Sequence, residues 1–204
     1  MTLPRELRTE RLYLRRWRID DRAPFARLNS DPRVVEFLPG ALSQEVSDAL
    51  ADRIQAHFEE HGFGQCAVEI SGIARFAGFI GLSLPRFEAK FTPCIEVGWR
   101  LDPDFWNQGY ATEGAQAALK FGFEALQATE IVSFTVPANI RSRRVMEKLG
   151  MTYSASDDFD HPLVPDGHPL RRHVLYRVGR TAFDQQSSQE KRLPWSAATY
   201  LSAP

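Results

Sequence analysis

The stretch of sequence that decides the fold lies at residues 95–126, and its first part reads IEVGWRLDPDFWNQGYATE over residues 95–113. The pattern predicts a strand over residues 95–101, a tight polar turn, and a long helix that begins at Gly109. Gly109 has no Cβ, so a ligand can come close to the main chain there. The first N–H groups of a helix have no partner within the helix and lie at the positive end of its dipole. We therefore expect an anion site at this turn, and a pyrophosphate would suit it.

An isolated Gly-x-Ala more often does no more than turn the chain, and two features favour a ligand site here. The turn lacks both the glycine and lysine spacing of a P-loop and the Gly-x-Gly-x-x-Gly of a dinucleotide fold, so the commonest rival phosphate sites are excluded. The strand before it also carries Gly98, where a second extended chain could lie alongside.

Two motifs carry a resemblance to a known family. Residues 96–99 (EVGW) and 105–113 (FWNQGYATE) resemble the acetyl-CoA motif of the GNAT superfamily of N-acetyltransferases, in the branch similar to the ribosomal-protein N-terminal (Rim-type) acetyltransferases. Trp106 replaces the Gln or Arg of the general superfamily pattern, as is usual for that branch. Residues 139–151 (NIRSRRVMEKLGM) resemble the next family motif. Two motifs in the right order are far more specific than either alone.

The resemblance implies an α+β fold with a strongly bent mixed β-sheet of about six or seven strands and helices on both faces. Two central parallel strands, residues 95–101 and 130–136, are expected to splay apart. With 204 residues, of which 43% are hydrophobic and 25% charged, the chain can bury one sizeable core. We therefore expect one acetyltransferase domain at residues 1–180, followed by a tail at residues 181–204.

The resemblance also implies acetyl-CoA as co-substrate. Its pantetheine arm would lie between the splayed strands, and its pyrophosphate would rest on main-chain N–H groups after Trp106. The residues expected to bind the cofactor are Val97, Gly98, Trp99, Leu101, Gln108, Gly109, Tyr110, Ala111, Thr112, Asn139 and Ser142. The acceptor would be a primary amine, either a protein or peptide α-amine or a small-molecule amine.

Two residues are candidates for the chemistry. Glu96 lies on the strand beside the expected thioester and could deprotonate the amine, directly or through a water molecule. It could equally be a structural carboxylate that pairs with a neighbouring strand or an arginine. Ser142 matches the family position that can donate a proton to the leaving CoA thiolate, although a serine in the first turn of a helix is often satisfied locally.

A different reading comes from His57-Phe58-Glu59-Glu60-His61, which matches the His-x-x-Glu-His pattern of a class of zinc peptidases. The same residues also suit a polar helix end that is closed by Gly62, with histidines near the negative end of the dipole. Short motifs of this kind often match by chance, so we expect no metal.

Composition limits the binding partners and the cellular compartment that we expect for this protein. The formal net charge of −1 provides no broad basic field, so we expect no nucleic acid. No apolar window reaches the length of a membrane span, and Cys66 and Cys94 have no metal or redox spacing, so we expect a cytoplasmic protein with no membrane partner. A homodimer is left open. A catalytically silent acyl-CoA-binding regulatory module is the alternative to an enzyme.

Overall fold

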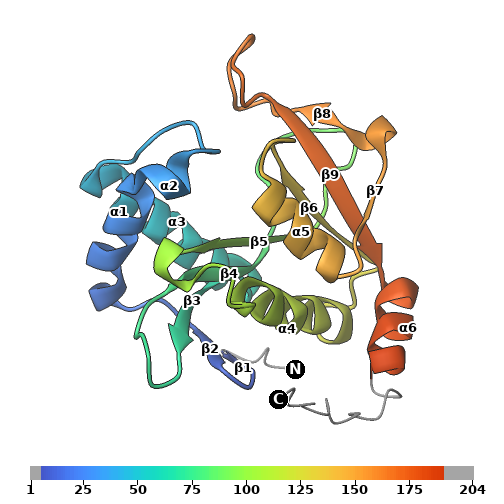
Figure 1. Ribbon diagram of the computed structural model, residues 1–204, viewed down its shortest axis with the longest axis horizontal. Coiled ribbons are helices and arrows are strands. Elements are labelled where there is room, and N and C mark those ends of the chain that lie inside the picture. The colour runs from blue at the N-terminus through green and yellow to red at the C-terminus, as the bar shows by residue number, and fades with distance from the viewer. Residues whose placement is uncertain (1–5, 191–204) are drawn as a thin grey trace, which may run out of the picture.

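One mixed β-sheet forms the centre of this computed structural model, which describes residues 6–190. The strand order is β1-β2-β3-β4-β5-β6-β9-β7, and β8 pairs with β9 (Figure 1). The strands are β1 (Leu7–Arg8), β2 (Leu12–Arg15), β3 (Gln65–Ile70), β4 (Gly78–Ser83), β5 (Glu96–Leu101), β6 (Glu130–Thr135), β7 (Thr152–Tyr153), β8 (Phe159–Asp160) and β9 (Arg172–Gly179). The α-helices are α1 (Arg22–Ser30), α2 (Pro32–Val35), α3 (Gln44–His61), α4 (Tyr110–Glu124), α5 (Ile140–Lys148) and α6 (Arg180–Glu190).

The α+β fold with a bent mixed sheet is confirmed, but the described residues form nine strands rather than the expected six or seven. The additional strands are β1 and β8, which are two residues long. A two-residue strand is too short to show the alternation of apolar and polar residues from which strands are predicted. Its existence depends on the partner strand beside it.

The two central strands part as the sequence predicts. β5 and β6 are parallel and share one registered pair, Glu96 with Val132, next to a hydrogen bond of 2.9 Å from the Val132 N–H to the Ile95 carbonyl. On its other edge β5 pairs with β4 along its whole length, from Glu96 to Leu101. The gap between β5 and β6 therefore opens after Glu96, and main-chain groups of β5 that point away from β4 face it.

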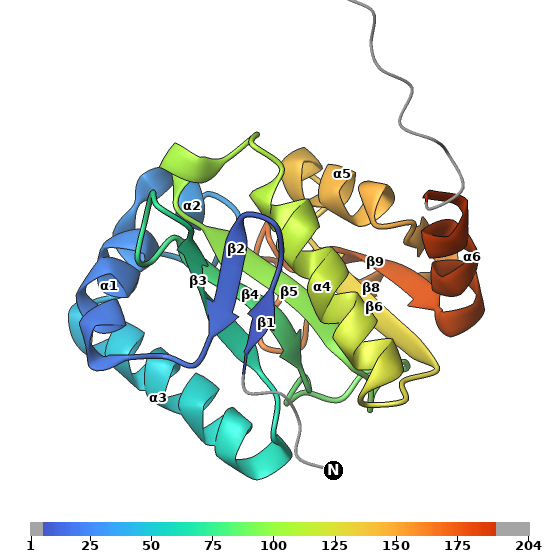
Figure 2. The ribbon, with the colours of Figure 1, turned by 90° about the horizontal axis from the view of Figure 1, so that it is seen from below.

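Helix α4 covers one face of the sheet and contacts strands on both sides of the gap, as Figure 2 shows. Two of its glycines lie directly on the strands. A Cβ at Gly114 would come within 2.5 Å of Ile80, and a Cβ at Gly122 within 2.6 Å of Ile131. Small residues on this side of the helix therefore allow a close approach to the sheet. Ile80 and Ile131 point toward α4, so their strand neighbours point to the opposite face.

The opposite face of β4 packs against α1. The Phe79 ring lies 6.1 Å from the Phe25 ring in an edge-to-face arrangement, and Phe25 is buried. Phe79 is paired with Arg100 across the two strands, so Arg100 also belongs to this face. Because alternate residues of a strand share a face, Glu96, Gly98 and Arg100 form a row on the side of the sheet away from α4.

Helix α6 begins directly after β9, and its Phe183 packs against Phe123 of α4 with ring centroids 4.9 Å apart. The first part of the expected tail is thus helical and joins the core. Residues 191–204 lie outside the described residues, and the division of the chain into a domain and a tail stays a prediction. Among the described residues, no helix combines the length and the apolar character that crossing a bilayer requires.

Candidate functional site

A side chain of the turn between β5 and α4 fixes the position of that turn. The indole N–H of Trp106 donates a hydrogen bond of 2.8 Å to the Leu101 carbonyl, which fixes the turn against the end of β5. Gly109 then takes a left-handed conformation with φ 85° and forms the N-cap of α4 without any side-chain cap. The N–H groups of the first helical turn therefore have no acceptor from within the helix. This uncapped helix start is the feature on which the expected anion site depends, and the site itself stays a prediction.

Arg11, in the loop between β1 and β2, contacts residues on both sides of Gly109. Its guanidinium donates to the Glu113 carboxylate at 2.6 Å and to the Gln108 carbonyl at 2.9 Å. It also lies 4.5 Å from the centroid of the Tyr110 ring. Glu113 lies in the first turn of α4, where a carboxylate is favoured by the helix dipole. One arginine thus joins both sides of the glycine turn.

A cavity of about 320 Å³ opens in front of the turn. Its lining comes from α2, the end of β5, the turn, the start of α4 and α5. Five of the lining side chains are cationic and none is acidic in the part of the chain that the structure describes: Arg33, Arg100, Arg141, Arg144 and Lys148. The chain as a whole has a net charge of −1, so this concentration of positive charge is local. The cavity suits a ligand with several negative charges.

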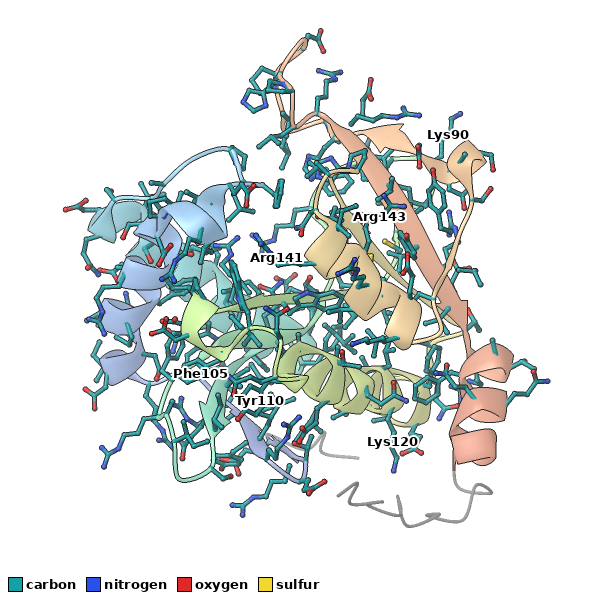
Figure 3. All side chains as sticks on the ribbon, viewed as in Figure 1. Lys90, Phe105, Tyr110, Lys120, Arg141 and Arg143 are labelled. Carbon is teal, nitrogen blue, oxygen red and sulfur yellow. The ribbon has the colours of Figure 1, made fainter. Side chains whose placement is uncertain are left out.

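Helix α5 forms the wall opposite the glycine turn. Asn139 caps it, because its side-chain oxygen accepts a hydrogen bond of 3.2 Å from the Ser142 N–H. Arg141 lies 4.5 Å from the Trp106 ring and forms an ion pair of 3.0 Å with Glu36. In Figure 3 Arg141 points from α5 across the space between α5 and α2. Cationic and aromatic side chains therefore meet at this side of the cavity.

Glu96 lies where β5 and β6 part, at the closed end of the gap. Its carboxylate is partly buried and accepts a hydrogen bond of 3.4 Å from the Ser83 hydroxyl. Burial raises the pKa of Glu96 to about 7, and the bond from Ser83 lowers it by a smaller amount. No arginine or lysine forms an ion pair with Glu96 in the described chain. A carboxyl with a pKa near neutrality can accept a proton near pH 7.

The structure separates the predicted site residues into two groups. Eight of the predicted residues line the cavity: Trp99, Leu101, Gly109, Tyr110, Ala111, Thr112, Asn139 and Ser142. The other four, Glu96, Val97, Gly98 and Gln108, lie outside its lining. Glu96 to Gly98 continue along β5 toward the closed end of the gap, and the Gln108 carbonyl is bound by Arg11.

Sequence reasoning missed Arg11, Arg100 and Lys148. Arg100 alternates with Glu96 and Gly98 along β5, and that period of two could have placed it on their face. Arg11 gives no local signal, since its partners lie about a hundred residues further along the chain. Of the three arginines of α5, Arg141 and Arg144 line the cavity, while Arg143 instead donates to the Tyr176 hydroxyl at 3.2 Å.

The first histidine of the zinc-like motif, His57, has a structural role. The Nε2 atom of His57 accepts a hydrogen bond of 3.1 Å from the Leu84 N–H, so its Nδ1 carries the proton and donates to the Phe63 carbonyl at 2.8 Å. Both ring nitrogens are thereby used by the main chain, and neither is free to bind a metal. Helix α3 ends at His61, and Gly62 at its C-cap is left-handed.

Comparisons with known proteins agree with this geometry. The uncharacterized N-acetyltransferase YnaD of Bacillus subtilis is 28% identical over 171 residues, which cover 83% of this chain and 94% of YnaD. The FsC-acetyl coenzyme A-N(2)-transacetylase of Aspergillus fumigatus is 33% identical over 100 residues, which cover 43% of each chain.

Solved structures share the fold. An acetyltransferase from Agrobacterium tumefaciens str. C58 has a TM-score of 0.69 at 27% identity, covering 88% of this chain and 96% of that one. Mycobacterium smegmatis RimJ in complex with CoA-disulfide has a TM-score of 0.66 at 18% identity, covering 88% of this chain and 89% of RimJ. The acetyltransferase (GNAT) domain family matches residues 11–152, and with the splayed strands and the uncapped helix end in place, the chain belongs to the GNAT acetyltransferases.

Proposed function

We propose that this acetyltransferase moves an acetyl group from acetyl-CoA to a primary amine by direct attack through a tetrahedral intermediate. The observation that carries the proposal is the basic cavity between the uncapped N-terminus of α4 and the gap between β5 and β6. A pyrophosphate at one end and a thin, hydrogen-bonding arm at the other are what such a site accommodates. Acetyl-CoA has both parts.

The phosphates would bind at the wide end of the cavity. The N–H groups of Tyr110, Ala111 and Thr112 would donate to the pyrophosphate, and each charge-assisted bond is worth roughly 1.5–3 kcal/mol before the costs of binding. Arg144 and Lys148, one turn apart on α5, would neutralise further phosphate charge. Trp99 and the N–H of Leu101 would meet the pantetheine arm, whose thioester would reach toward Val97 and Gly98.

The chemistry would take place at the closed end of the gap. The neutral amine attacks the thioester carbonyl, its nitrogen bonds to carbon, and the gap-facing main-chain N–H of Val97 holds the oxyanion, a contact worth about 2.7–4 kcal/mol of barrier. Glu96, directly or through water, takes the proton that the amine loses. The C–S bond then breaks, and the Ser142 hydroxyl gives a proton to the CoA thiolate and regains one from solvent.

Direct transfer is favoured over an acyl-cysteine intermediate. Burial raises the pKa of the Cys66 thiol to about 12 and that of Cys94 to about 11. Neither thiol therefore exists as a thiolate near pH 7, and the thiolate is the nucleophilic form. Neither cysteine lines the cavity.

The test combines binding and turnover. Calorimetry should detect acetyl-CoA binding, and a thiol assay with a panel of primary amines should detect release of CoA. Glu96→Gln should lower kcat about 10²–10⁴-fold, the range expected for loss of a general base, while acetyl-CoA still binds. Binding without turnover of any amine, and no effect of Glu96→Gln or Ser142→Ala, would favour the regulatory module instead.

A further inference from the structure

Arg100 lacks a carboxylate partner although it lies in the interior of the site. One guanidinium nitrogen donates to the Asn29 side-chain oxygen at 2.5 Å, and the group lies 5.4 Å from the Phe79 ring centroid. Asn29 is fully buried and is itself held by the Ser47 hydroxyl at 2.8 Å. No carboxylate forms an ion pair with Arg100 anywhere in the described chain. Burial lowers its pKa to about 10.

This environment differs from that of the other interior arginine. Arg15 is fully buried and is bound by Asp21 at 2.7 Å and by Glu69 at 3.2 Å, whereas Arg100 is partly buried and has no such partner. Removing a charge from water without an ionic partner is costly, and a carboxylate on a ligand would supply that partner for Arg100. A guanidinium presents a planar set of donors that matches a carboxylate at two points. Arg100 also lines the cavity, so an anion can reach it from there.

Arg100 lies on the face of the sheet away from α4, which argues against a phosphate of acetyl-CoA as the anion that it binds. Arg100 points toward Asn29 of α1 and Phe79, whereas α4 and its N–H groups lie on the face of Ile80. Arg144 and Lys148 already provide cations on the α5 side of the cavity. An anion at Arg100 would approach from the α2 side, where Arg33 also lines the cavity but already pairs with Asp31 at 2.6 Å.

We propose that Arg100 binds a carboxylate carried by the acceptor, so that the acceptor is a small ω-amino acid rather than a simple amine. The inference rests on the proposed function, because it places the amine at Glu96. Glu96 and Arg100 are four residues apart on one face of β5, so their Cα atoms lie about 13 Å apart. Arg100 lines the cavity, and the Glu96 carboxylate lies beside Gly98, where a Cβ would be 3.7 Å from its oxygen. An acceptor with several methylenes between amine and carboxylate spans this distance better than an α-amino acid.

The experiment is a length series with matched neutral amines. Acceptors would be glycine, β-alanine, 4-aminobutyrate and 6-aminohexanoate, each paired with the alkylamine of equal chain length, and kcat/KM would be measured by thiol release. We expect the acid-to-alkylamine ratio of kcat/KM to rise along the series and to exceed about tenfold for the longer acids. Arg100→Gln should abolish this ratio, and Arg100→Lys should restore part of it. The matched control Arg53→Gln removes an exposed arginine of α3 and should leave the ratio unchanged.

A second measurement separates failure of this inference from failure of the proposed function. Binding of N-acetyl-6-aminohexanoate to the CoA-loaded protein needs no turnover, and calorimetry should give at least tenfold weaker binding for Arg100→Gln. Equal binding to wild type and Arg100→Gln, or a ratio near one for every acceptor pair, overturns the carboxylate site while acetyl transfer stands. An Arg100→Gln variant whose acetyl-CoA affinity falls by the same factor would instead assign Arg100 to the cofactor.

Discussion

At the scale of single residues, the chemistry depends on one carboxyl and the hydrogen bond that it accepts. With the pKa of Glu96 raised to about 7, the carboxyl is protonated at lower pH and cannot accept a proton from the amine. We therefore expect kcat/KM to fall as the pH drops through about 7. This decrease in kcat/KM near pH 7 should be absent in Glu96→Gln, whose low residual rate depends only on ionisation of the amine.

The variant Ser83→Ala gives a second test of the role of Glu96. The Ser83 hydroxyl stabilises the ionised form of Glu96 and so lowers the pKa of that carboxyl. Ser83→Ala should move the decrease in kcat/KM that Glu96 causes to higher pH, and well above that pH its kcat/KM should stay close to that of wild type. If Glu96→Gln and Ser83→Ala both lose activity at the same pH as wild type, Glu96 is not the group that titrates.

Several site residues could be predicted from sequence because local main-chain geometry determines them. Gly109 marks a left-handed turn whatever the rest of the fold does, and Asn139 caps α5 through the N–H of Ser142, three residues further on. Arg11 gives no local signal, and for Arg100 the alternation along β5 indicates only the face of the sheet. Their roles depend on contacts with Glu113 and Asn29, which only the folded sheet brings near.

At the scale of elements, the glycine turn before α4 should tolerate no side chain. Gly109 has φ 85°, which strains any residue with a Cβ, and a Cβ there would lie 3.2 Å from an Arg11 nitrogen. Gly109→Ala should therefore cost about 1 kcal/mol of folding stability or somewhat more. It should also weaken acetyl-CoA binding about tenfold or more, because the helix N–H groups shift relative to the phosphates. Thermal unfolding and calorimetry measure the two effects.

Gly72 provides the control for that substitution. It also has a positive φ, 72°, but a Cβ there would have no atom within 4 Å, and it lies in the turn between β3 and β4, outside the cavity lining. Gly72→Ala should show a similar loss of stability and unchanged acetyl-CoA affinity. Equal loss of affinity in both variants would show that the effect of Gly109→Ala is general destabilisation.

The end of α3 is joined to the chain after β4 by His57. His57→Leu leaves the Leu84 N–H and the Phe63 carbonyl without partners, and each lost partner costs about 1–3 kcal/mol when buried. We expect the midpoint of thermal unfolding to fall by several degrees, at about 2–4 °C per kcal/mol for a chain of this size. His61→Leu, one turn away and partly exposed, should have a much smaller effect.

The same contacts give stability a dependence on pH. Burial lowers the pKa of His57 below its ordinary value of 6.5, so the unfolded chain binds a proton more readily than the folded one. The contribution of His57 is fully present above pH 6.5 and is lost as the pH falls below it. Wild type should lose stability between pH 7.5 and 5.5 more steeply than His57→Leu. Equal dependence of stability on pH in wild type and His57→Leu would contradict a neutral His57 ring that is hydrogen-bonded at both nitrogens.

At the scale of the whole molecule, the sheet consists of two antiparallel parts, β1 to β5 and β6 to β9, that meet at one registered pair. The sequence could indicate the parting strands only through the family motif, since the gap leaves no periodic signal of its own. The short strand β8, which pairs with β9, could not be predicted because two residues are too few to give a periodic signal.

This architecture predicts that acetyl-CoA binding stabilises the junction between the two parts. The cofactor would bridge the open edges of β5 and β6 while α4 spans both parts from one face. Hydrogen exchange should therefore slow on cofactor binding at the gap-facing amides of Val97, Trp99 and Leu101 and at the N-terminal amides of α4, with little change in β2 and β3. Slowing spread evenly over the sheet would reflect general stabilisation by a ligand, and no slowing along β5 would place the cofactor elsewhere. Gly109→Ala, measured at saturating acetyl-CoA, should reduce the protection at α4 first, because the phosphates contact that helix while the pantetheine arm contacts β5.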